Sequence, residues 1–403
     1  MTKVAIVGGG PAGSATALNL LAAGVDPGDI AIFDRATFPR PKLCGGALTW
    51  RGTEALRELI GEQPDLGGET RALEFRCSLG AFPVRERGAQ WLYDRAHLDH
   101  LLLQRCIDAG VTVHQKTPIK AVQIDGDRAA LVTAKTIRTY DWVVGADGAR
   151  GVVARSLALG GGIVGRLVEA VYRTEGSRHE RDRLYFDFDP IVDGIPGYAW
   201  IFQYPKPHTE GLWKIGIMDG RGVTPGKALR AWTDRYAERN GFTRVDEKIA
   251  GWPEHYYSPK TRAHRPGVIL VGEAWGIDPL LGEGIAPALY MARYAAGKLK
   301  AALDVGVPTI GGYERDFRRT DEGRNLNFQR HLANLLYGKG AHRWLRVLFG
   351  HEYMKQLAAS GEEAYGRLEK HTWKLIRSYA GQALRRGFPS NAPIRATEQE
   401  QGA

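Results

Sequence analysis

The chain has 403 residues, 43% hydrophobic and 25% charged, a globular composition that excludes collagen-like and low-complexity classes. No apolar run approaches the roughly 18 residues that a transmembrane helix needs, and glycines interrupt the N-terminal apolar stretch where a signal peptide would continue. The three cysteines Cys44, Cys77 and Cys106 stand at wide spacings, so we expect neither a disulfide framework nor a metal site. These features predict a cytoplasmic protein.

The net charge is +10, and residues 301–403 hold 16 Lys and Arg against 11 Asp and Glu. Such an excess favours solubility, and it also suits an anionic substrate, an acidic protein partner or peripheral contact with an anionic membrane. No recognition motif for nucleic acid accompanies the charge, so we do not expect nucleic acid as a partner.

The first 35 residues have the pattern of a nucleotide-binding strand–helix–strand unit. Lys3–Val7 predicts a buried parallel strand, and the G-x-G-x-x-G turn Gly8–Gly13 leads into an apolar helix that ends at Gly24. A second strand, Ile30–Phe33, ends in an acid 21 residues after the last glycine of the turn, where a carboxylate binds a ribose hydroxyl. An acid at this position favours FAD or NAD over NADP. The candidate cofactor residues here are Gly8, Gly10, Pro11, Ala12, Gly13, Asp34 and Arg35.

The segment Pro39–Leu48 places Cys44 between a basic run and a pair of glycines. No partner cysteine lies at a suitable spacing, which leaves two interpretations. Cys44 is either a small buried hydrophobe or, as the family resemblance given below implies, a marker of the substrate side of the cofactor, where Gly45 and Gly46 let the backbone approach the cofactor ring.

Two later strand ends carry further motifs. The strand Trp142–Val144 runs into Gly145-Ala146-Asp147-Gly148, and the strand Val268–Val271 runs into Gly272-Glu273. A Pro/Gly-rich loop then precedes a helix that we expect to begin at about Ile285.

The order of these three motifs resembles the FAD-binding pattern of the para-hydroxybenzoate hydroxylase-like flavoproteins. The resemblance implies that Glu273 binds the ribityl chain and that Asp147 secures the turn beside the pyrophosphate. It places the loop Pro279–Gly284 beside the isoalloxazine, where the dipole of the following helix stabilises anionic reduced flavin. The cofactor residues added in this way are Asp147, Gly148, Gly272, Glu273, Gly282, Gly284 and Ile285.

The segment Tyr93–Val113 resembles the R-x-x-(L/F)-D-x-x-L helix of the same flavoproteins, in which Arg95 approaches the cofactor. Helical spacing predicts a packed core for Leu98, Leu101, Leu102 and Cys106, so Cys106 is expected to be a plain buried thiol.

The stretches "FPRPKLCGGALTWRG" and "GYAWIF" resemble segments of the geranylgeranyl reductase family of flavoproteins. In that family the aromatics that match Tyr198, Trp200 and Phe202 line the cavity on the substrate face of the flavin. Alternate strand residues share one face, so these three side chains should point together, toward a cavity or a packed core. Trp275 stands where the family usually has alanine, and we expect it to narrow the flavin cavity or stack over a substrate ring.

The sequence shows no nucleophilic triad and no paired-carboxylate site, so the chemistry would belong to the flavin. A single G-x-G-x-x-G turn that leads from a predicted strand into a predicted helix implies that NAD(P)H or another electron donor binds only transiently. The resemblance implies an FAD-dependent oxidoreductase whose reduced flavin reduces an alkene in a hydrophobic substrate, with Cys44, Tyr198, Trp200 and Trp275 as candidate catalytic residues. The alternatives are a monooxygenase that hydroxylates an aromatic ring of a small molecule or protein side chain through a flavin hydroperoxide, a halogenase, and an electron-transfer flavoprotein.

We therefore predict an α/β fold in which a Rossmann-type FAD-binding domain is interleaved with an antiparallel-sheet substrate domain and followed by C-terminal helices. The predicted boundaries are 1–70, 95–165 and 255–305 for the FAD-binding domain, 71–94 and 166–254 for the substrate domain, 306–390 for the C-terminal helical region and 391–403 for a flexible tail. Within the helical region, Trp344, Leu345, Leu348 and Phe349 could cap the cavity, bind a membrane or partner, or simply pack.

Overall fold

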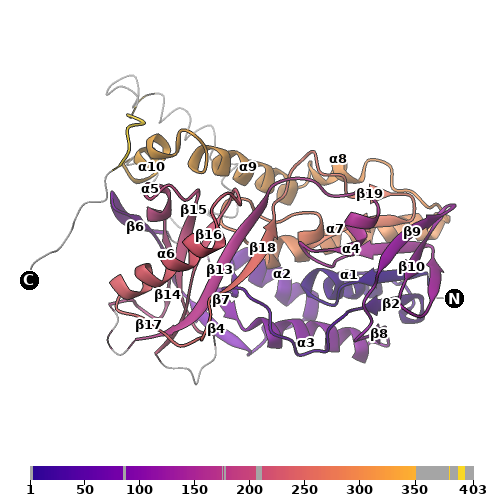
Figure 1. Ribbon diagram of the computed structural model, residues 1–403. Helices are drawn as coiled ribbons and strands as arrows, with labels where there is room; N and C mark the ends of the chain where they lie inside the picture. Colours follow the sequence, from indigo (N-terminus) through magenta and orange to yellow (C-terminus); the bar gives the residue numbers. More distant parts are fainter. Residues whose placement is uncertain are drawn as a thin grey trace, which may run out of the picture.

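The computed structural model describes residues 3–84, 88–174, 176, 178–205, 211–350, 381 and 389–394. These residues form two halves that lie side by side, one built on a parallel sheet and the other on a larger sheet (Figure 1). Strands of the parallel sheet come from residues 4–33, 112–145 and 264–270, and strands of the larger sheet come from residues 72–84 and 164–255. The halves are therefore interleaved in sequence, and the α/β fold class is the predicted one; the residue boundaries of the domains stay predictions.

The parallel sheet has the order β19-β20-β12-β1-β2-β8, and only β19 runs antiparallel to its neighbour. Its strands are β1 (Val4–Val7), β2 (Ile30–Phe33), β8 (Thr112–His114), β12 (Trp142–Gly145), β19 (His264–Arg265) and β20 (Val268–Leu270). Strand β1 pairs with β2 on one side and with β12 on the other, so the strand order reverses at β1. Ligands of such sheets bind in the crevice outside the carboxyl ends of the strands at this reversal.

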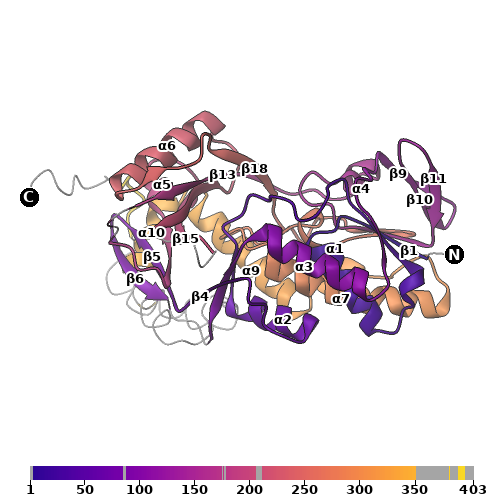
Figure 2. The same ribbon diagram turned by 90° about the horizontal axis from the view of Figure 1, so that it is seen from below.

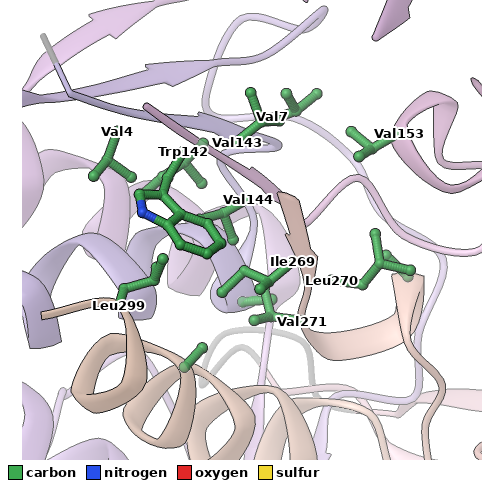
Figure 3. Close-up of a cluster of buried hydrophobic side chains, with 14 of the residues drawn as sticks. Val4, Val7, Trp142, Val143, Val144, Val153, Ile269, Leu270, Val271 and Leu299 are labelled. Atoms are coloured by element: carbon green, nitrogen blue, oxygen red, sulfur yellow. The ribbon is translucent and has the colours of Figure 1, made fainter. Parts of the chain in front are cut away.

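The four central strands β20, β12, β1 and β2 are buried throughout because both faces of this part of the sheet are covered. Figure 3 shows the resulting core, where the Trp142 ring lies among valine and isoleucine side chains of the strands and Leu299 of a helix. Helices α1 (Pro11–Ala22), α2 (Trp50–Ile60), α3 (Arg95–Asp108) and α7 (Ile285–Val305) gather on one side (Figure 2). The short helix α4 (Val152–Ser156) and a three-stranded sheet of β9 (Ala121–Asp125), β10 (Arg128–Val132) and β11 (Ile137–Tyr140) pack into the same core.

The glycine turn after β1 has the predicted form. Helix α1 begins with Pro11, which suits the first helical position because its missing N–H would be unpaired there. A Cβ atom at Gly13 would lie 1.9 Å from the Gly8 carbonyl oxygen, so only glycine lets the helix approach the strand this closely. Gly24 has a φ of +83° just past the helix end, as expected of a terminating glycine.

The larger sheet has the order β17-β13-β16-β15-β14-β5-β6, and β18 pairs with a further part of β13. It is antiparallel except for the parallel pair β14 and β5. The strands are β5 (Ala72–Cys77), β6 (Gly80–Val84), β13 (Val164–Arg173), β14 (Arg183–Asp187), β15 (Gly197–Gln203), β16 (Leu212–Asp219), β17 (Thr243–Arg244) and β18 (Ala250–His255).

Every residue of β15 is buried because the two faces of the larger sheet meet different cores. Ala199 and Ile201 pack toward α6 (Gly226–Arg239), whereas Tyr198, Trp200 and Phe202 belong to the core on the opposite face. The three aromatic residues therefore do point the same way, as strand geometry predicts. A small sheet of β3 (Ala47–Leu48), β7 (Gln90–Tyr93) and β4 (Gly67–Thr70) lies between the halves, as Figure 2 shows for β4.

Helices α8 (Tyr313–Phe317), α9 (Asp321–Leu336) and α10 (Ala341–Gly350) follow, with α9 and α10 along the upper side in Figure 1. Leu345 and Phe349 are buried in the core of the larger sheet, and Trp344 and Leu348 are partly buried against it, so this cluster packs. The short helix α5 (Asp189–Val192) lies beside α10. No helix in the described part of the chain is long and apolar enough to cross a membrane.

The start of the predicted tail is attached to α10 and to the core of the larger sheet. Ile394 is buried in the same core, and the Arg346 guanidinium donates 2.8 Å hydrogen bonds to the carbonyl oxygens of Ser390 and Ala392. Ile394 is therefore packed and the backbone before it is bound to α10, although Asn391, Ala392 and Pro393 are exposed. The rest of the predicted tail, and the helical prediction for 351–380 and 382–388, lie outside the described residues.

Candidate FAD and substrate site

A cavity of about 830 Å³ opens at the carboxyl ends of β1, β2 and β12 and reaches the inner face of the larger sheet. We call its first part the nucleotide branch; it is lined by residues of the parallel-sheet half, among them Gly8, Gly10, Pro11, Ala12, Asp34, Arg35, Arg95, Asp147, Gly148, Glu273, Gly282, Gly284 and Ile285. We call the second part the apolar branch; it is lined by Leu73, Leu167, Leu184, Phe186, Tyr198, Trp200, Phe202, Met218, Trp252 and Glu254. Cys44, Gly45 and Gly46 also line the cavity.

The turn at the nucleotide branch is fixed by Asp34 at the end of β2. One carboxylate oxygen accepts a 2.8 Å hydrogen bond from the Gly9 amide and the other accepts one of 2.8 Å from the Ala36 amide. Gly8 adopts a φ of +109°, and a Cβ atom there would lie 2.3 Å from the Ala146 carbonyl oxygen. The turn can therefore form only with glycine at position 8.

Two helices begin at this cavity without a side-chain cap. Gly10 precedes α1 and Gly284 precedes α7, and neither helix has a side-chain hydrogen bond to its first amides. Uncapped N-terminal amides and the helix dipole favour an anion. The nucleotide branch is thus prepared for negatively charged groups at two points.

Asp147 caps α4 and leaves one oxygen without a partner. Its Oδ2 atom accepts hydrogen bonds from the amides of Val152 and Val153, at 2.5 and 3.1 Å, which secures the turn as predicted. Its Oδ1 atom is buried without a hydrogen-bond partner among the described atoms, and burial raises the pKa of this carboxyl to about 6. An unpaired carboxyl oxygen at a cavity wall is suited to a hydroxyl donor.

These features fit FAD. The two uncapped helix N-termini suit the pyrophosphate and the flavin ring, Asp34 lies where a ribose hydroxyl is bound, and Glu273 lines the same wall as Asp147. A Cβ atom at Gly10 would have only two described atoms within 4 Å, in the side chains of Arg40 and Asp99, so the backbone is open for close approach there.

The segment Cys44–Gly46 joins the two branches and is held on several sides. The Cys44 carbonyl oxygen accepts a 2.7 Å hydrogen bond from the Lys214 ammonium, and its sulfur accepts one of 3.4 Å from the Gly46 amide. A Cβ atom at Gly45 would lie 2.8 Å from the Phe202 ring, and one at Gly46, whose φ is +84°, would lie 2.1 Å from the Tyr93 carbonyl oxygen. Both glycines are thus required by packing.

Arg95 lines the cavity as expected of a residue near the cofactor. Its guanidinium makes two hydrogen bonds to Asp99, at 2.7 and 3.0 Å, and Arg40 approaches the same carboxylate at 3.4 Å. Bidentate pairing fixes the orientation of the planar guanidinium at the cavity wall. The particular role of Arg95 stays a prediction.

Tyr198 and Trp200 both line the apolar branch and are also hydrogen-bonded. The Tyr198 hydroxyl donates to the Leu281 carbonyl oxygen, and the Trp200 indole N–H donates to Glu169 at 3.2 Å. Tyr337 at the end of α9 donates its hydroxyl to the neighbouring Leu280 carbonyl oxygen at 2.6 Å. Two tyrosines therefore fix the loop that precedes α7.

Two expectations for site residues are corrected by the structure. Trp275 does not line the cavity; it is 1% exposed and packs among Tyr257, Tyr313 and Phe317, with ring centroids 4.6 to 6.2 Å away. It therefore cannot narrow the flavin cavity.

Gly272 does not line the cavity either. A Cβ atom at Gly272 would lie 2.6 Å from the Cβ atom of Ala12, so this glycine lets the 3₁₀ turn Gly272–Ala274 pack on α1. Gly13 also lies outside the cavity lining; as described above, it lets α1 approach the end of β1.

Other cavity residues were missed by sequence reasoning. Thr117–Lys120 follow β8, whose carboxyl end lies at the same edge as that of β2, so the crevice rule for parallel sheets could have indicated them. Arg150, Arg155 and Glu254 carry no pattern that separates them from surface residues.

Comparison with known proteins agrees with this geometry. Residues 1–167 match the family model described as FAD binding domain. Digeranylgeranylglycerophospholipid reductase 1 of Methanopyrus kandleri is 28% identical over 353 residues, which cover 79% of this chain and 88% of that protein. A geranylgeranyl bacteriochlorophyll reductase-like protein of Thermoplasma acidophilum has a TM-score of 0.74 at 19% identity, covering 94% of this chain and 98% of that one. The halogenase PltM in complex with phloroglucinol and FAD has a TM-score of 0.68 at 15% identity, covering 96% and 87%.

Fold, site and matches together define an FAD-dependent oxidoreductase, and FAD is the cofactor. The glycine turn after β1, the Asp147-Gly148 turn after β12, the acids Asp34 and Glu273 and the Cys44–Gly46 segment all line one cavity. Within this class the chain is similar to a digeranylgeranylglycerophospholipid reductase in sequence and to a geranylgeranyl bacteriochlorophyll reductase-like protein in fold.

Cys44→Ser is expected to lower turnover about tenfold while FAD content changes less than twofold. The sulfur lies where the two branches meet, beside the Gly46 amide, whereas the nucleotide branch is built by other segments. FAD content per purified protein and single-turnover flavin reoxidation would measure the two effects. Equal losses of FAD and turnover would contradict a local role at the junction; Cys77→Ser, on β5 and outside the cavity lining, is the control.

Proposed function

We propose that this protein saturates carbon–carbon double bonds in an isoprenoid or comparable hydrophobic chain. The observation that carries the proposal is the apolar branch, whose lining side chains are aliphatic or aromatic apart from Glu254. An alkene offers no hydrogen-bonding group, so an apolar wall that continues from the cofactor site suits it. The similarity to a digeranylgeranylglycerophospholipid reductase supports this substrate class.

The residues of the chain hold and orient the reacting groups. Reduced FAD, when bound, supplies a hydride. Lys214 holds the Cys44 carbonyl at the junction of the branches, while Tyr198 and Tyr337 hold the loop before α7. The aromatic wall of Tyr198, Trp200 and Phe202 excludes water from the apolar branch.

The electron donor and the setting are part of the proposal. We infer a donor that binds transiently, NAD(P)H or a reducing protein, since Gly8–Gly13 is the one G-x-G-x-x-G match that leads from a strand into a helix in the described part of the chain. The net charge of +10 supports peripheral contact with an anionic membrane that carries the lipid substrate, or an acidic protein partner, in a cytoplasmic protein.

The test is anaerobic turnover of the FAD-loaded protein, reduced with dithionite or NAD(P)H, on a phospholipid with geranylgeranyl chains. We expect a product about 2 Da heavier for each reduced double bond, and no such product from free reduced FAD. An oxygenated or chlorinated aromatic product formed only in air would instead support a monooxygenase or halogenase. Stable partner binding without turnover would support an electron-transfer flavoprotein.

A further inference from the structure

Glu254 is the one carboxyl group that the described part of the larger sheet contributes to the cavity lining. It lies near the end of β18 and is 8% exposed. Its neighbours on the wall of the apolar branch include Trp252 and Met218. Burial of a carboxyl group in an otherwise apolar wall costs free energy, and such groups cluster at functional sites.

The contacts of Glu254 place it between the loop before α7 and the apolar branch. The Tyr256 hydroxyl donates a 2.9 Å hydrogen bond to Oε2. A Cβ atom at Gly282, whose φ is +70°, would lie 3.2 and 3.3 Å from the two carboxyl oxygens and 3.3 Å from the Met218 sulfur. The carboxyl group therefore faces the loop where the sequence resemblance places the flavin ring.

The surroundings of Glu254 keep its proton in place at neutral pH. Burial raises the pKa of this carboxyl to about 8, with Glu273 and Asp278 adding to the rise, while the Tyr256 hydrogen bond and the Lys42 ammonium oppose it. The hydroxyls of Tyr198 and Tyr337 also face this region, but they donate to the carbonyl oxygens of Leu281 and Leu280. Glu254 is thus a protonated carboxyl group with access to the apolar branch.

We propose that Glu254 is the general acid that supplies the proton in alkene reduction at this site, an inference that rests on the proposed function. Saturation of one double bond requires a hydride at one carbon and a proton at the other. The hydride brings both electrons and comes from the bound reduced flavin. The Glu254 O–H bond breaks, its proton forms the second C–H bond with the π electrons, and Glu254 remains as a carboxylate. It regains a proton from solvent between turnovers.

Glu254→Gln removes the acidic proton and preserves the shape of the side chain, and its amide oxygen can still accept from Tyr256. We expect the reoxidation rate of reduced holoenzyme by the geranylgeranyl phospholipid to fall about 10²- to 10⁴-fold, the usual share of general acid catalysis. FAD affinity, measured by fluorescence titration, should change less than twofold. The wild-type rate should be constant below pH 8 and fall above it, because the acid form is the active one.

Tyr256→Phe provides a second variant that keeps the carboxyl group. Loss of the Tyr256 hydrogen bond removes an influence that lowers the pKa of Glu254, so the falling limb of the pH profile should move to higher pH. Infrared difference spectra of the wild type in H₂O and D₂O should show a protonated carboxyl band that Glu254→Gln lacks. The pH profile of Tyr256→Phe and the infrared spectra can both be measured even if Glu254→Gln turns over very slowly.

The outcomes separate the two proposals. The role of Glu254 would be overturned, and the proposed function would stand, if wild type and Glu254→Gln both formed saturated product at rates within threefold of each other and with the same fall in rate above pH 8. An unmoved limb in Tyr256→Phe would overturn it as well. Absence of saturated product from the wild type would overturn the proposed function, and the inference with it.

Discussion

Gly8→Ala is expected to abolish FAD binding, with a loss of affinity of at least about 100-fold. The residue has a φ of +109°, a conformation that side chains disfavour, and its Cβ would lie 2.3 Å from the Ala146 carbonyl oxygen and 2.7 Å from its carbon. Those atoms are backbone and cannot move aside as a flexible side chain would. The turn must therefore shift at the point where β1 and β12 present their carboxyl ends to the cofactor.

Gly24→Ala is the matched control for this prediction. Gly24 also has a positive φ, +83°, but nothing lies within 4 Å of the position of its Cβ. This variant should be destabilised by about 1–2 kcal/mol through backbone strain alone and should keep its FAD. FAD content after purification and fluorescence titration give the comparison. If Gly8→Ala retains FAD, or if both variants lose it equally, the turn is not the steric requirement that we describe.

The nucleotide half could be predicted because its determinants are local. An uninterrupted apolar run such as Val4–Val7 is what a strand buried on both faces requires, and the glycine turn with Pro11 at the helix start follows directly. The predicted helix start at Ile285 also agrees with the structure, since the glycines before it end the loop. Several of the deciding contacts, such as the Asp34 hydrogen bond to the Gly9 amide, join residues near each other in the sequence, whereas the approach of Gly8 to Ala146 does not.

The larger sheet, and the site residues that the sequence analysis missed, depend on contacts between residues far apart in the sequence, which a local sequence pattern does not indicate. Strand β14 pairs in parallel with β5, and the carboxyl group of Glu254 meets Gly282 from the other half. Trp275 stands where the resembled family usually has alanine, and this difference suggested that its side chain narrows the flavin cavity. Its side chain instead packs against Tyr313 and Phe317, which lie on α8, about forty residues later in the chain.

The second large effect is expected for Lys214→Met, at a buried group of polar residues on the larger sheet. Lys214 is 7% exposed and donates a 2.7 Å hydrogen bond to the Cys44 carbonyl oxygen. Glu169 is 3% exposed and accepts a hydrogen bond from the Trp200 indole at 3.2 Å. Burial raises the pKa of its carboxyl, and Lys214 opposes that rise. The variant leaves the Cys44 carbonyl without this donor and Glu169 without its cation.

Removal of one member of such a group should lower the free energy of unfolding by about 3 kcal/mol, because a buried charge loses its compensation. Turnover should fall further than FAD content, since the Cys44–Gly46 segment loses its anchor on the larger sheet while the nucleotide branch is untouched. Chemical denaturation, FAD content and single-turnover reoxidation would be measured together. Lys227→Met, at an exposed position on α6, should change stability by less than about 0.5 kcal/mol.

The double variant Lys214→Met with Glu169→Gln tests whether the loss is electrostatic. The neutral amide keeps an acceptor for the Trp200 indole but needs no cation, so the double variant should regain part of the stability that Lys214→Met loses. Turnover should stay low in the double variant, because the Cys44 carbonyl still lacks its ammonium donor. If Lys214→Met costs no more stability than Lys227→Met, or if the double variant recovers full turnover, Lys214 does not position the Cys44–Gly46 segment.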